Sequence, residues 1–280
     1  MKKVIDCFIF YNELDMLDFR LKELNDHVDK FVLVESTHTF TGKLKKMFFN
    51  ENKDRYKDYL DKIEHIIVDD CPNTDNPWDN EIYQRMCIKK GIENLKPQDH
   101  DIIIISDVDE IPNSHAIELI KKYDKTTPFT MMIMDMYYFN ITTKDKNPWV
   151  EGTRLLPYGM FRDEFDSDSQ CIRFTFSDMF RVNHPKMKTR PGVRIIKNGG
   201  WHLSYFGDEQ FIQNKIMNFS HQEYNKPHIT DLNEIKRCVD ERKDICQRKG
   251  IEFNHVPIET NGFLPKTITT GSYFKFFLDR

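Results

Sequence analysis

The chain has 280 residues and a formal net charge of −4 at pH 7, with 41 basic and 45 acidic residues. Hydrophobic residues make up 39% of it, which excludes a disordered chain and is ample for the core of one large α/β domain or two small ones. The near balance of charge gives no reason to expect nucleic acid or an acidic membrane surface as a partner.

Three features of the sequence bear on where in the cell the protein is located. The sequence contains no run of 18 apolar residues, so we expect no transmembrane anchor. Its first residues (MKKVIDC) turn polar too quickly for a signal peptide, and its six cysteines stand without a Cys-x-x-Cys pair. Together these features predict a soluble, cytoplasmic protein with reduced thiols.

The first half of the chain alternates predicted strands with predicted helices. Apolar runs predict strands at 4–11, 31–36, 63–70 and 102–106, and the segments between them predict helices at 14–24, 54–60 and 79–95. We expect Asn12 to cap the first helix. This βαβαβαβ order predicts an α/β fold with a twisted, mostly parallel, Rossmann-like sheet.

The second half is richer in predicted strands. After a helix that ends near residue 123, strands are predicted at 129–140, 149–157, 171–182 and 193–197, and helices at 209–221 and 231–249. No Gly/Ser-rich or Pro-rich linker interrupts the chain. We therefore expect a single domain over 1–280 with two unequal halves, 1–125 and 126–280.

The most informative stretch is a strand that runs into three acidic residues. Four isoleucines in a row, Ile102 to Ile105, predict a strand buried on both faces. Asp107, Asp109 and Glu110 then stand at its carboxyl end, where open α/β sheets bind ligands. Carboxylate oxygens at that edge suit a divalent cation such as Mg²⁺ or Mn²⁺, and a solvated strand end or a helix cap is the alternative.

A second unusual stretch, 199–207, joins two glycines to His202. An imidazole is an acceptable Mn²⁺ ligand, although a single histidine is more often a structural group. Asp208 and Glu209 begin a predicted helix, where they either cap it or serve as a general base if they face a cleft. Asp135 lies in an apolar strand, so it is exposed, paired or functional, because an unpaired buried charge is costly.

Six short segments of this chain occur in a distinctive order. They are 7–17 (CFIFYNELDML), 31–36 (FVLVES), 106–112 (SDVDEIP), 152–154 (GTR), 200–207 (GWHLSYFG) and 263–266 (FLPK). Together they resemble glycosyltransferase family 17 along residues 4 to about 270. Each segment is weak alone, but their order is specific. The resemblance is to the catalytic region of that family, without the membrane anchor and stem of its Golgi members.

The resemblance implies a GT-A type fold, with 1–125 as a nucleotide-binding half and 126–280 as an acceptor-side half. It also implies that the protein is an inverting, metal-dependent glycosyltransferase. The donor would be a UDP-sugar, with GlcNAc as the family's sugar, and the acceptor a glycan or glycoprotein. The metal would be Mn²⁺ or Mg²⁺.

Carried over by position, the resemblance also implies roles for single residues. The metal ligands are expected to be Asp107, Asp109 and His202, with Asp107 also reaching the donor ribose. The residues expected to contact the UDP-sugar are Phe10, Tyr11, Asn12, Glu35, Arg85, Asp107 and Arg154. The acceptor hydroxyl needs a base as it attacks, and the candidates are Glu209, then Asp208 and Asp135.

Two other functions remain open from the sequence. A sugar-nucleotidyltransferase would need a Gly-rich phosphate loop after the first strand, where Tyr11, Asn12 and Glu13 stand instead. A degenerate domain would bind sugar nucleotide or glycan without turnover, and the presence of Asp107, Asp109 and His202 disfavours it.

Overall fold

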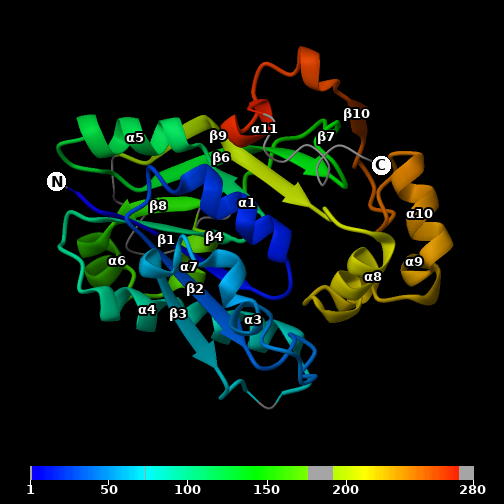
Figure 1. Ribbon diagram of the computed structural model, residues 1–280, viewed down its shortest axis with the longest axis horizontal. Helices are drawn as coiled ribbons and strands as arrows, with labels where there is room; N and C mark the ends of the chain where they lie inside the picture. The colour runs from blue at the N-terminus through cyan, green and yellow to red at the C-terminus, as the bar shows by residue number, and fades with distance from the viewer. Residues whose placement is uncertain (1, 73, 176–191, 271–280) are drawn as a thin grey trace.

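The computed structural model describes residues 2–72, 74–175 and 192–270 (Figure 1). Its strands are β1 (Val4–Phe10), β2 (Lys30–Ser36), β3 (Ile63–Val68), β4 (Ile102–Asp107), β5 (Glu110–Pro112), β6 (Thr130–Tyr138), β7 (Thr143–Asp145), β8 (Arg154–Pro157), β9 (Arg194–Ser204) and β10 (Phe253–His255). Its α-helices are α1 (Leu14–Leu24), α2 (Phe48–Glu51), α3 (Pro77–Met86), α4 (Ile88–Leu95), α5 (Ser114–Tyr123), α6 (Tyr158–Glu164), α7 (Ser169–Phe174), α8 (Glu209–Asn218), α9 (Pro227–Thr230), α10 (Leu232–Asp240) and α11 (Lys266–Thr269).

These strands form one mixed sheet in the order β10-β7-β6-β8-β4-β1-β2-β3, with β9 pairing with β5 and β6. The neighbours β4, β1, β2 and β3 are parallel, which confirms the α/β fold with a parallel first half. Beyond β4, strand β8 runs antiparallel to its neighbours, and β9 runs parallel to β6. The second half is therefore β-rich, as the sequence predicts, but joined to the same sheet.

The strand order reverses at β1, which has β2 on one side and β4 on the other. Such a switch point leaves a crevice outside the carboxyl ends of the two strands, because their connections leave to opposite sides. Ile9 near the end of β1 lies opposite Asp107 at the end of β4. The acidic residues that follow Ile105 are therefore delivered to this crevice.

The sheet is covered on both faces. One apolar cluster joins α1, α5 and α11 to one face, and a second joins α4, α6 and α7 to the other (Figure 1). The side chains of Ile102 to Ile105 are fully buried, and they alternate between the two clusters. This confirms that β4 is buried on both faces, as a run of β-branched residues without polar alternation predicts.

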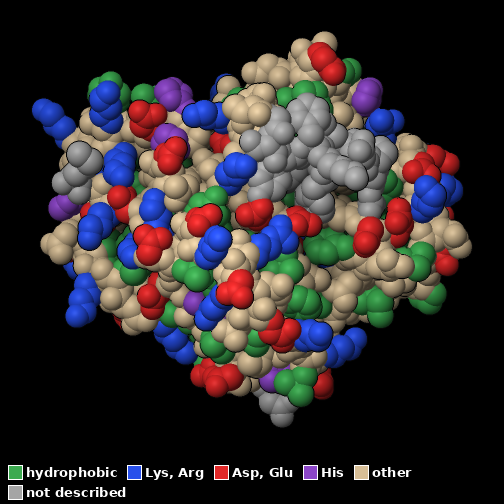
Figure 2. All heavy atoms as spheres, viewed as in Figure 1, with side chains coloured by type: hydrophobic (Ala, Val, Ile, Leu, Met, Phe, Trp, Pro, Cys, Tyr) green, Lys and Arg blue, Asp and Glu red, His purple; other side chains and the backbone are tan. Residues whose placement is uncertain are grey.

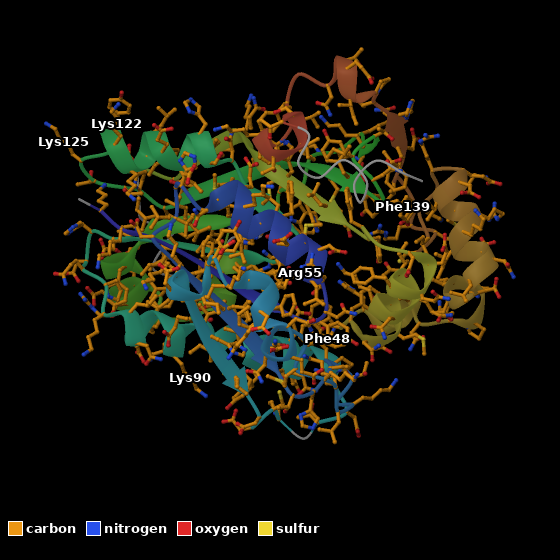
Figure 3. All side chains as sticks on the ribbon, viewed as in Figure 1. Phe48, Arg55, Lys90, Lys122, Lys125 and Phe139 are labelled. Carbon is orange, nitrogen blue, oxygen red and sulfur yellow. The ribbon has the colours of Figure 1, made fainter. Side chains whose placement is uncertain are left out.

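A third cluster packs α8 and α10 against the far end of β6. Phe139, which follows β6, contributes its ring to this cluster beside Phe253 (Figure 3). On the face shown in Figure 2, acidic and basic side chains are interspersed, in keeping with the near balance of charge. None of the helices in the described part of the chain is both long enough and apolar enough to cross a membrane.

Strand β9 depends on the pair of glycines that directly precedes Trp201. Gly200 has φ +146°, and a Cβ there would lie 2.1 Å from the carbonyl oxygen of Ile111. Only glycine allows this approach, which lets β9 pair with β5 and β6 together. Its pairing places His202 opposite Glu110, at the acidic edge of the crevice.

Several predicted elements differ in the structure. The strand expected at 171–182 begins as helix α7, capped by Asp168, and its residues beyond 175 lie outside the described ones. Asn12 does not cap α1, whose N-cap position is held by Glu13 without a side-chain hydrogen bond. The helices expected at 79–95 and 231–249 are, respectively, divided at Cys87 and ended after Asp240.

Candidate active site

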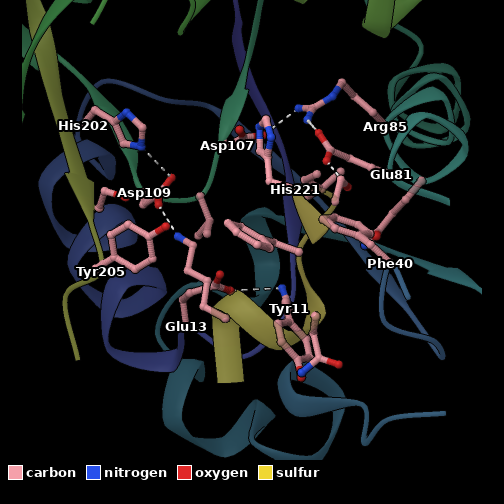
Figure 4. A pocket seen from close by; sticks show the side chains of 18 of the residues that line it. Tyr11, Glu13, Phe40, Glu81, Arg85, Asp107, Asp109, His202, Tyr205 and His221 are labelled. Carbon is pink, nitrogen blue, oxygen red and sulfur yellow. Dashed lines mark hydrogen bonds and ion pairs between the residues drawn. The ribbon is translucent and has the colours of Figure 1, made fainter. Parts of the chain in front are cut away.

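A cavity of about 420 Å³ lies at the carboxyl ends of β1 and β4 (Figure 4). Both halves of the chain line it. The first half contributes the turn after β1, the segment between β2 and α2, and α3, and the second contributes β6, β9, α8 and the segment after α8. This is the crevice that the strand order creates, with the Asp107–Asp109 turn at its centre.

Two arginines hold the carboxylate of Asp107. Its Oδ1 accepts a hydrogen bond from Nη1 of Arg85 at 2.6 Å, and its Oδ2 accepts one from Nη2 of Arg173 at 2.6 Å. Burial alone would raise the pKa of Asp107, but the guanidinium groups of Arg173 and Arg85 hold it below its usual value. Asp107 is therefore a paired anion between two fixed cations.

The carboxylate of Asp109 faces the other half of the cavity. Its Oδ2 accepts a hydrogen bond from Nζ of Lys215 on α8 at 2.8 Å, and its Oδ1 lies 3.5 Å from Nε2 of His202 (Figure 4). Burial would raise the pKa of Asp109, but Lys215 and His202 lower it far below its usual value. In turn burial would lower the pKa of Lys215, but Asp109 raises it. This ion pair joins α8 to the acidic turn.

Of the three expected metal ligands, the structure brings Asp109 and His202 together, while both oxygens of Asp107 are taken by arginines. Within the described ranges no group of three His, Cys, Asp or Glu side chains could enclose a metal ion. His202 Nδ1 is buried and has no hydrogen-bond partner among the described residues. Because Mg²⁺-type sites are often built from one or two protein ligands together with phosphate oxygens and water, Asp109 and His202 would suit a divalent cation whose other ligands come from outside the protein.

The turn Asp107–Glu110, the acidic turn, is fixed by hydrogen bonds from the side chain of Arg20, which is fully buried. Its Nη1 donates to the carbonyl oxygens of Asp107, Val108 and Glu110 at 2.9, 3.2 and 2.6 Å. Its remaining nitrogens donate to both carboxylate oxygens of Asp6 at 2.8 and 2.6 Å. The planar guanidinium group of arginine carries five N–H donors, so it can bond to three carbonyl oxygens and one carboxylate at the same time.

Glu110, the third acidic residue of the motif, is structural. It is fully buried, and its carboxylate accepts hydrogen bonds from Nη1 and Nη2 of Arg173, each at 2.7 Å. It also accepts one from Nε1 of Trp149 at 2.7 Å and one from the backbone N–H of Asp107 at 3.1 Å. Glu110 thus ties the loop around Trp149 to the turn, and the Trp149 indole lies 4.7 Å from the His202 ring between centroids.

Phe10, at the end of β1, and Tyr11, which follows it, line the cavity. The backbone N–H of Tyr11 donates to Glu13 at 3.1 Å, which fixes the turn after β1 (Figure 4). The ammonium of Lys45 lies over the rings of Tyr11 and Phe48, at 5.3 and 5.6 Å from their centroids. Burial lowers the pKa of Lys45, and its Nζ lies 3.8 Å from Oε1 of Glu35. A nearly buried cation beside aromatic rings suits an anionic or carbonyl-bearing ligand.

Three residues expected to contact the donor do not line this cavity. The side-chain nitrogen of Asn12 donates to Asn214 at 3.3 Å, across the two halves. Glu35 is fully buried and accepts hydrogen bonds from the backbone N–H groups of Phe49 and Asn50 at 2.9 and 3.3 Å. Arg154 is also fully buried and donates to backbone carbonyls, including that of Gly152 at 2.9 Å. Arg85, by contrast, does line the cavity.

The three candidate bases from the sequence also lie away from the cavity lining. Asp208 is the N-cap of α8 and accepts a hydrogen bond from the backbone N–H of Phe211 at 2.7 Å. Asp135 accepts one from Nζ of Lys144 at 2.6 Å, so pairing explains its place in an apolar strand. Glu209 is the first residue of α8. No role in the cavity follows for them from this placement.

Aromatic residues of the second half of the chain, including Tyr138 and Tyr205, form the aromatic end of the cavity. The rings of Tyr138 and Tyr205 stack with centroids 5.9 Å apart, and the ammonium of Lys215 lies 5.5 Å from the Tyr205 centroid. Tyr205 has φ +59°, an uncommon backbone conformation for a bulky residue. Such flat apolar surfaces suit the C–H faces of a sugar ring, and the hydroxyl groups of tyrosine add polar contacts.

Sequence reasoning missed Arg20, Arg173, Lys215 and Trp149. Each is an unremarkable residue within a predicted helix, strand or loop, and its partner is distant in sequence. Of the four, only Trp149 carried a signal, because it lies three residues before the Gly152-Thr-Arg segment.

Comparisons with known proteins agree on one family. The sequence model of glycosyltransferase family 17 matches residues 1–155, just over half of the chain. The enzymes named beta-1,4-mannosyl-glycoprotein 4-beta-N-acetylglucosaminyltransferase from Rattus norvegicus and Homo sapiens are each 30% identical over 146 residues. These alignments cover 49% of this chain and 27% of each relative, so the chain matches about a quarter of their length. The segments 200–207 and 263–266 lie beyond the family match.

Solved structures show weaker likeness. An active-site mutant of LgtC aligns with a TM-score of 0.35 and 12% identity, covering 69% of this chain and 72% of that one. The glycosyltransferase GlyE of Streptococcus pneumoniae TIGR4 aligns with a TM-score of 0.34 and 12% identity, covering 70% of this chain and 46% of that one.

Proposed function

The chain belongs to glycosyltransferase family 17, and on this premise we propose that it transfers N-acetylglucosamine from UDP-GlcNAc to a hydroxyl group of a glycan acceptor, with inversion at the anomeric carbon. The name of the curated relatives supports this sugar and a glycoprotein glycan as the acceptor. Inversion follows from the family resemblance and needs one base on the acceptor side of the sugar.

The observation that carries the proposal is the meeting of Asp109, His202 and Lys215 at the switch point of the sheet. A nucleotide diphosphate is anionic, and the positively charged residues Arg85, Arg173 and Lys215 line the cavity. A divalent cation held by Asp109 and His202 would neutralise the charge that develops on the leaving diphosphate.

The protein's own groups supply orientation. Phe10 and Tyr11 offer aromatic faces to the uracil base, and Lys45 offers a donor to its carbonyl oxygens. Arg85 and Arg173 hold Asp107 still, so that it accepts a hydroxyl of the ribose or a water without moving. Fixed charges of this kind stabilise a transition state better than mobile ones, because they need no reorganisation during the reaction.

Asp109→Asn tests the proposal, since it removes the negative charge and keeps the shape. We expect the wild-type chain to bind UDP more tightly in Mn²⁺ than in EDTA by isothermal titration calorimetry, and D109N to lose that difference. Asp163→Asn, at an exposed ion pair with Arg162, is the matched control and should leave it intact. If Mn²⁺ increases the affinity for UDP equally in D109N and the wild type, Asp109 is not a ligand of the metal ion.

A thermal-shift panel of UDP-GlcNAc, UDP-glucose, UDP-galactose, UDP-GalNAc and GDP-mannose then identifies the donor. A donor at about 100 times its Kd adds roughly 2.7 kcal/mol to the stability of the folded chain. Stabilisation by UDP-GlcNAc above the others supports the proposed sugar, and preference for another UDP-sugar would refute it while leaving a transferase. Binding without any release of UDP would instead indicate a degenerate domain.

A further inference from the structure

The carboxylates that line the cavity differ in what they contact. They are Glu13, Glu81, Asp107, Asp109 and Glu151. Asp107 and Asp109 are paired with cations, as described above, and Glu81 accepts a hydrogen bond from Nη2 of Arg85 at 2.7 Å. Oε2 of Glu13 accepts hydrogen bonds from the backbone N–H groups of Tyr11 and Asn12 at 3.1 and 3.0 Å.

Glu151 is the exception. Its side chain is exposed, and it forms neither a hydrogen bond nor a direct ion pair with any of the described residues. It acts on the buried Arg154 only through space. Of the five carboxylates, it is therefore the one that has no partner to give up among the described residues before it contacts a ligand.

The backbone around Glu151 is nevertheless fixed beside the acidic turn. Trp149 exchanges two backbone hydrogen bonds with Met134, at 2.8 and 3.0 Å, and its indole donates to Glu110. On the other side, a Cβ on Gly152 would lie 2.6 Å from the Trp149 indole and 3.3 Å from the carboxyl carbon of Glu110. The chain before and after Glu151 is thus packed against the turn that ends in Asp109.

Glu151 is a cavity-lining carboxylate that the second half of the chain contributes. Glu151 and Trp149 line the same cavity as Tyr138 and Tyr205, whose stacked rings offer a surface for a sugar. Glu13, by comparison, belongs to the turn after β1, at the nucleotide-binding end (Figure 4). A base must reach the acceptor hydroxyl on the side of the donor sugar opposite the leaving diphosphate.

We propose that Glu151 is the general base of the transfer and that the acceptor sugar stacks on the aromatic end of the cavity beside it. This inference rests on the proposed function. The Glu151 carboxylate takes the proton of the acceptor hydroxyl as its oxygen forms a bond to the anomeric carbon. The bond from that carbon to the phosphate oxygen breaks, and its electron pair leaves with UDP. Glu151 then releases the proton to solvent.

The test compares Glu151→Gln with the wild type in UDP release from UDP-GlcNAc in Mn²⁺, with water and with methyl β-mannoside as acceptors. We expect E151Q to lower kcat by about 10²-fold or more, because general-base catalysis contributes on that order. The Kd for UDP should not change. E151D should retain part of the activity, because it keeps a carboxylate. Glu118→Gln, on the exposed face of α5, is the matched control and should keep full activity.

The pH profile separates catalysis from structure. The wild-type kcat should fall on the acidic side as the base is protonated, and the residual activity of E151Q should lack that dependence. Normal turnover in E151Q, or loss of turnover in Glu13→Gln with E151Q unaffected, would overturn the assignment and leave the proposed function standing. A wild-type chain that releases no UDP with either acceptor would overturn the proposed function and this inference with it.

Discussion

Arg20 offers the sharpest test of how the fold builds the site. It is fully buried, and it joins Asp6 of β1 to the carbonyls of the acidic turn through hydrogen bonds of 2.6 to 3.2 Å. Arg20→Met keeps an apolar stem of similar length and removes the fork of donors. It leaves the Asp6 carboxylate buried without its cation and three carbonyls without their donor.

The cost can be estimated from this geometry. Removing one partner of a buried ion pair costs about 3–5 kcal/mol, because the remaining charge is desolvated and unpaired. At about 2.1 cal/mol/K per residue, a chain of this length has an unfolding entropy of about 0.6 kcal/mol/K, so R20M should lower Tm by about 5–8 °C. The double variant D6N/R20M should recover part of the loss, because it also removes the stranded charge.

The assay is thermal and urea unfolding, followed by UDP titration in Mn²⁺ at a temperature where every variant is folded. R20M should also weaken UDP binding, because the turn that carries Asp107 and Asp109 loses its support. Arg194→Met is the matched control, since Arg194 pairs with Asp124 at 2.7 Å where both side chains are partly exposed. Such a pair contributes about 0–1 kcal/mol. This role of Arg20 would be refuted if R20M lost no more stability than R194M, or if its affinity for UDP were unchanged.

Two further variants test other parts of the site. Lys45→Met should stabilise the free chain near neutral pH and weaken UDP binding, because burial lowers the pKa of Lys45 and holding its charge costs stability. This gain in stability of K45M over the wild type should shrink as the pH rises towards 10.5, since Lys45 is then uncharged when the chain folds. If the difference in free energy of unfolding between K45M and the wild type, measured in urea, stays constant between pH 7 and 10, this explanation is wrong. Gly200→Ala should cost more than about 2 kcal/mol, since its Cβ would meet the Ile111 carbonyl at φ +146°, whereas Gly262→Ala, with no atom within 4 Å, should be nearly neutral. Equal melting temperatures for these two glycine variants would count against the close pairing of β9 with β5.

The sequence identified the parts of the site that are built locally. Four isoleucines followed by Asp107 and Asp109 predict a buried strand with acidic residues at its end, because burial and strand direction are read from neighbouring residues. The glycines before His202 also marked a close backbone approach, which Gly200 confirms. For Glu35, the sequence predicted the correct strand end but not the direction of the side chain, which points to the backbone of α2.

What the sequence could not show is which distant groups meet these carboxylates. Arg20 contacts the carbonyl of Asp107 across 87 residues, Lys215 reaches Asp109 across 106, and Arg173 reaches Asp107 across 66. The candidate bases show the same limit, since Asp208 caps a helix and Asp135 pairs with Lys144. Propensity and periodicity act over a few residues, whereas the charges that pair with a buried carboxylate are chosen by the packing of the whole sheet and its helices. The sequence therefore determined where the acidic turn lies, and the tertiary structure decided which cations surround it and which cavity-lining carboxylate has no partner among the described residues.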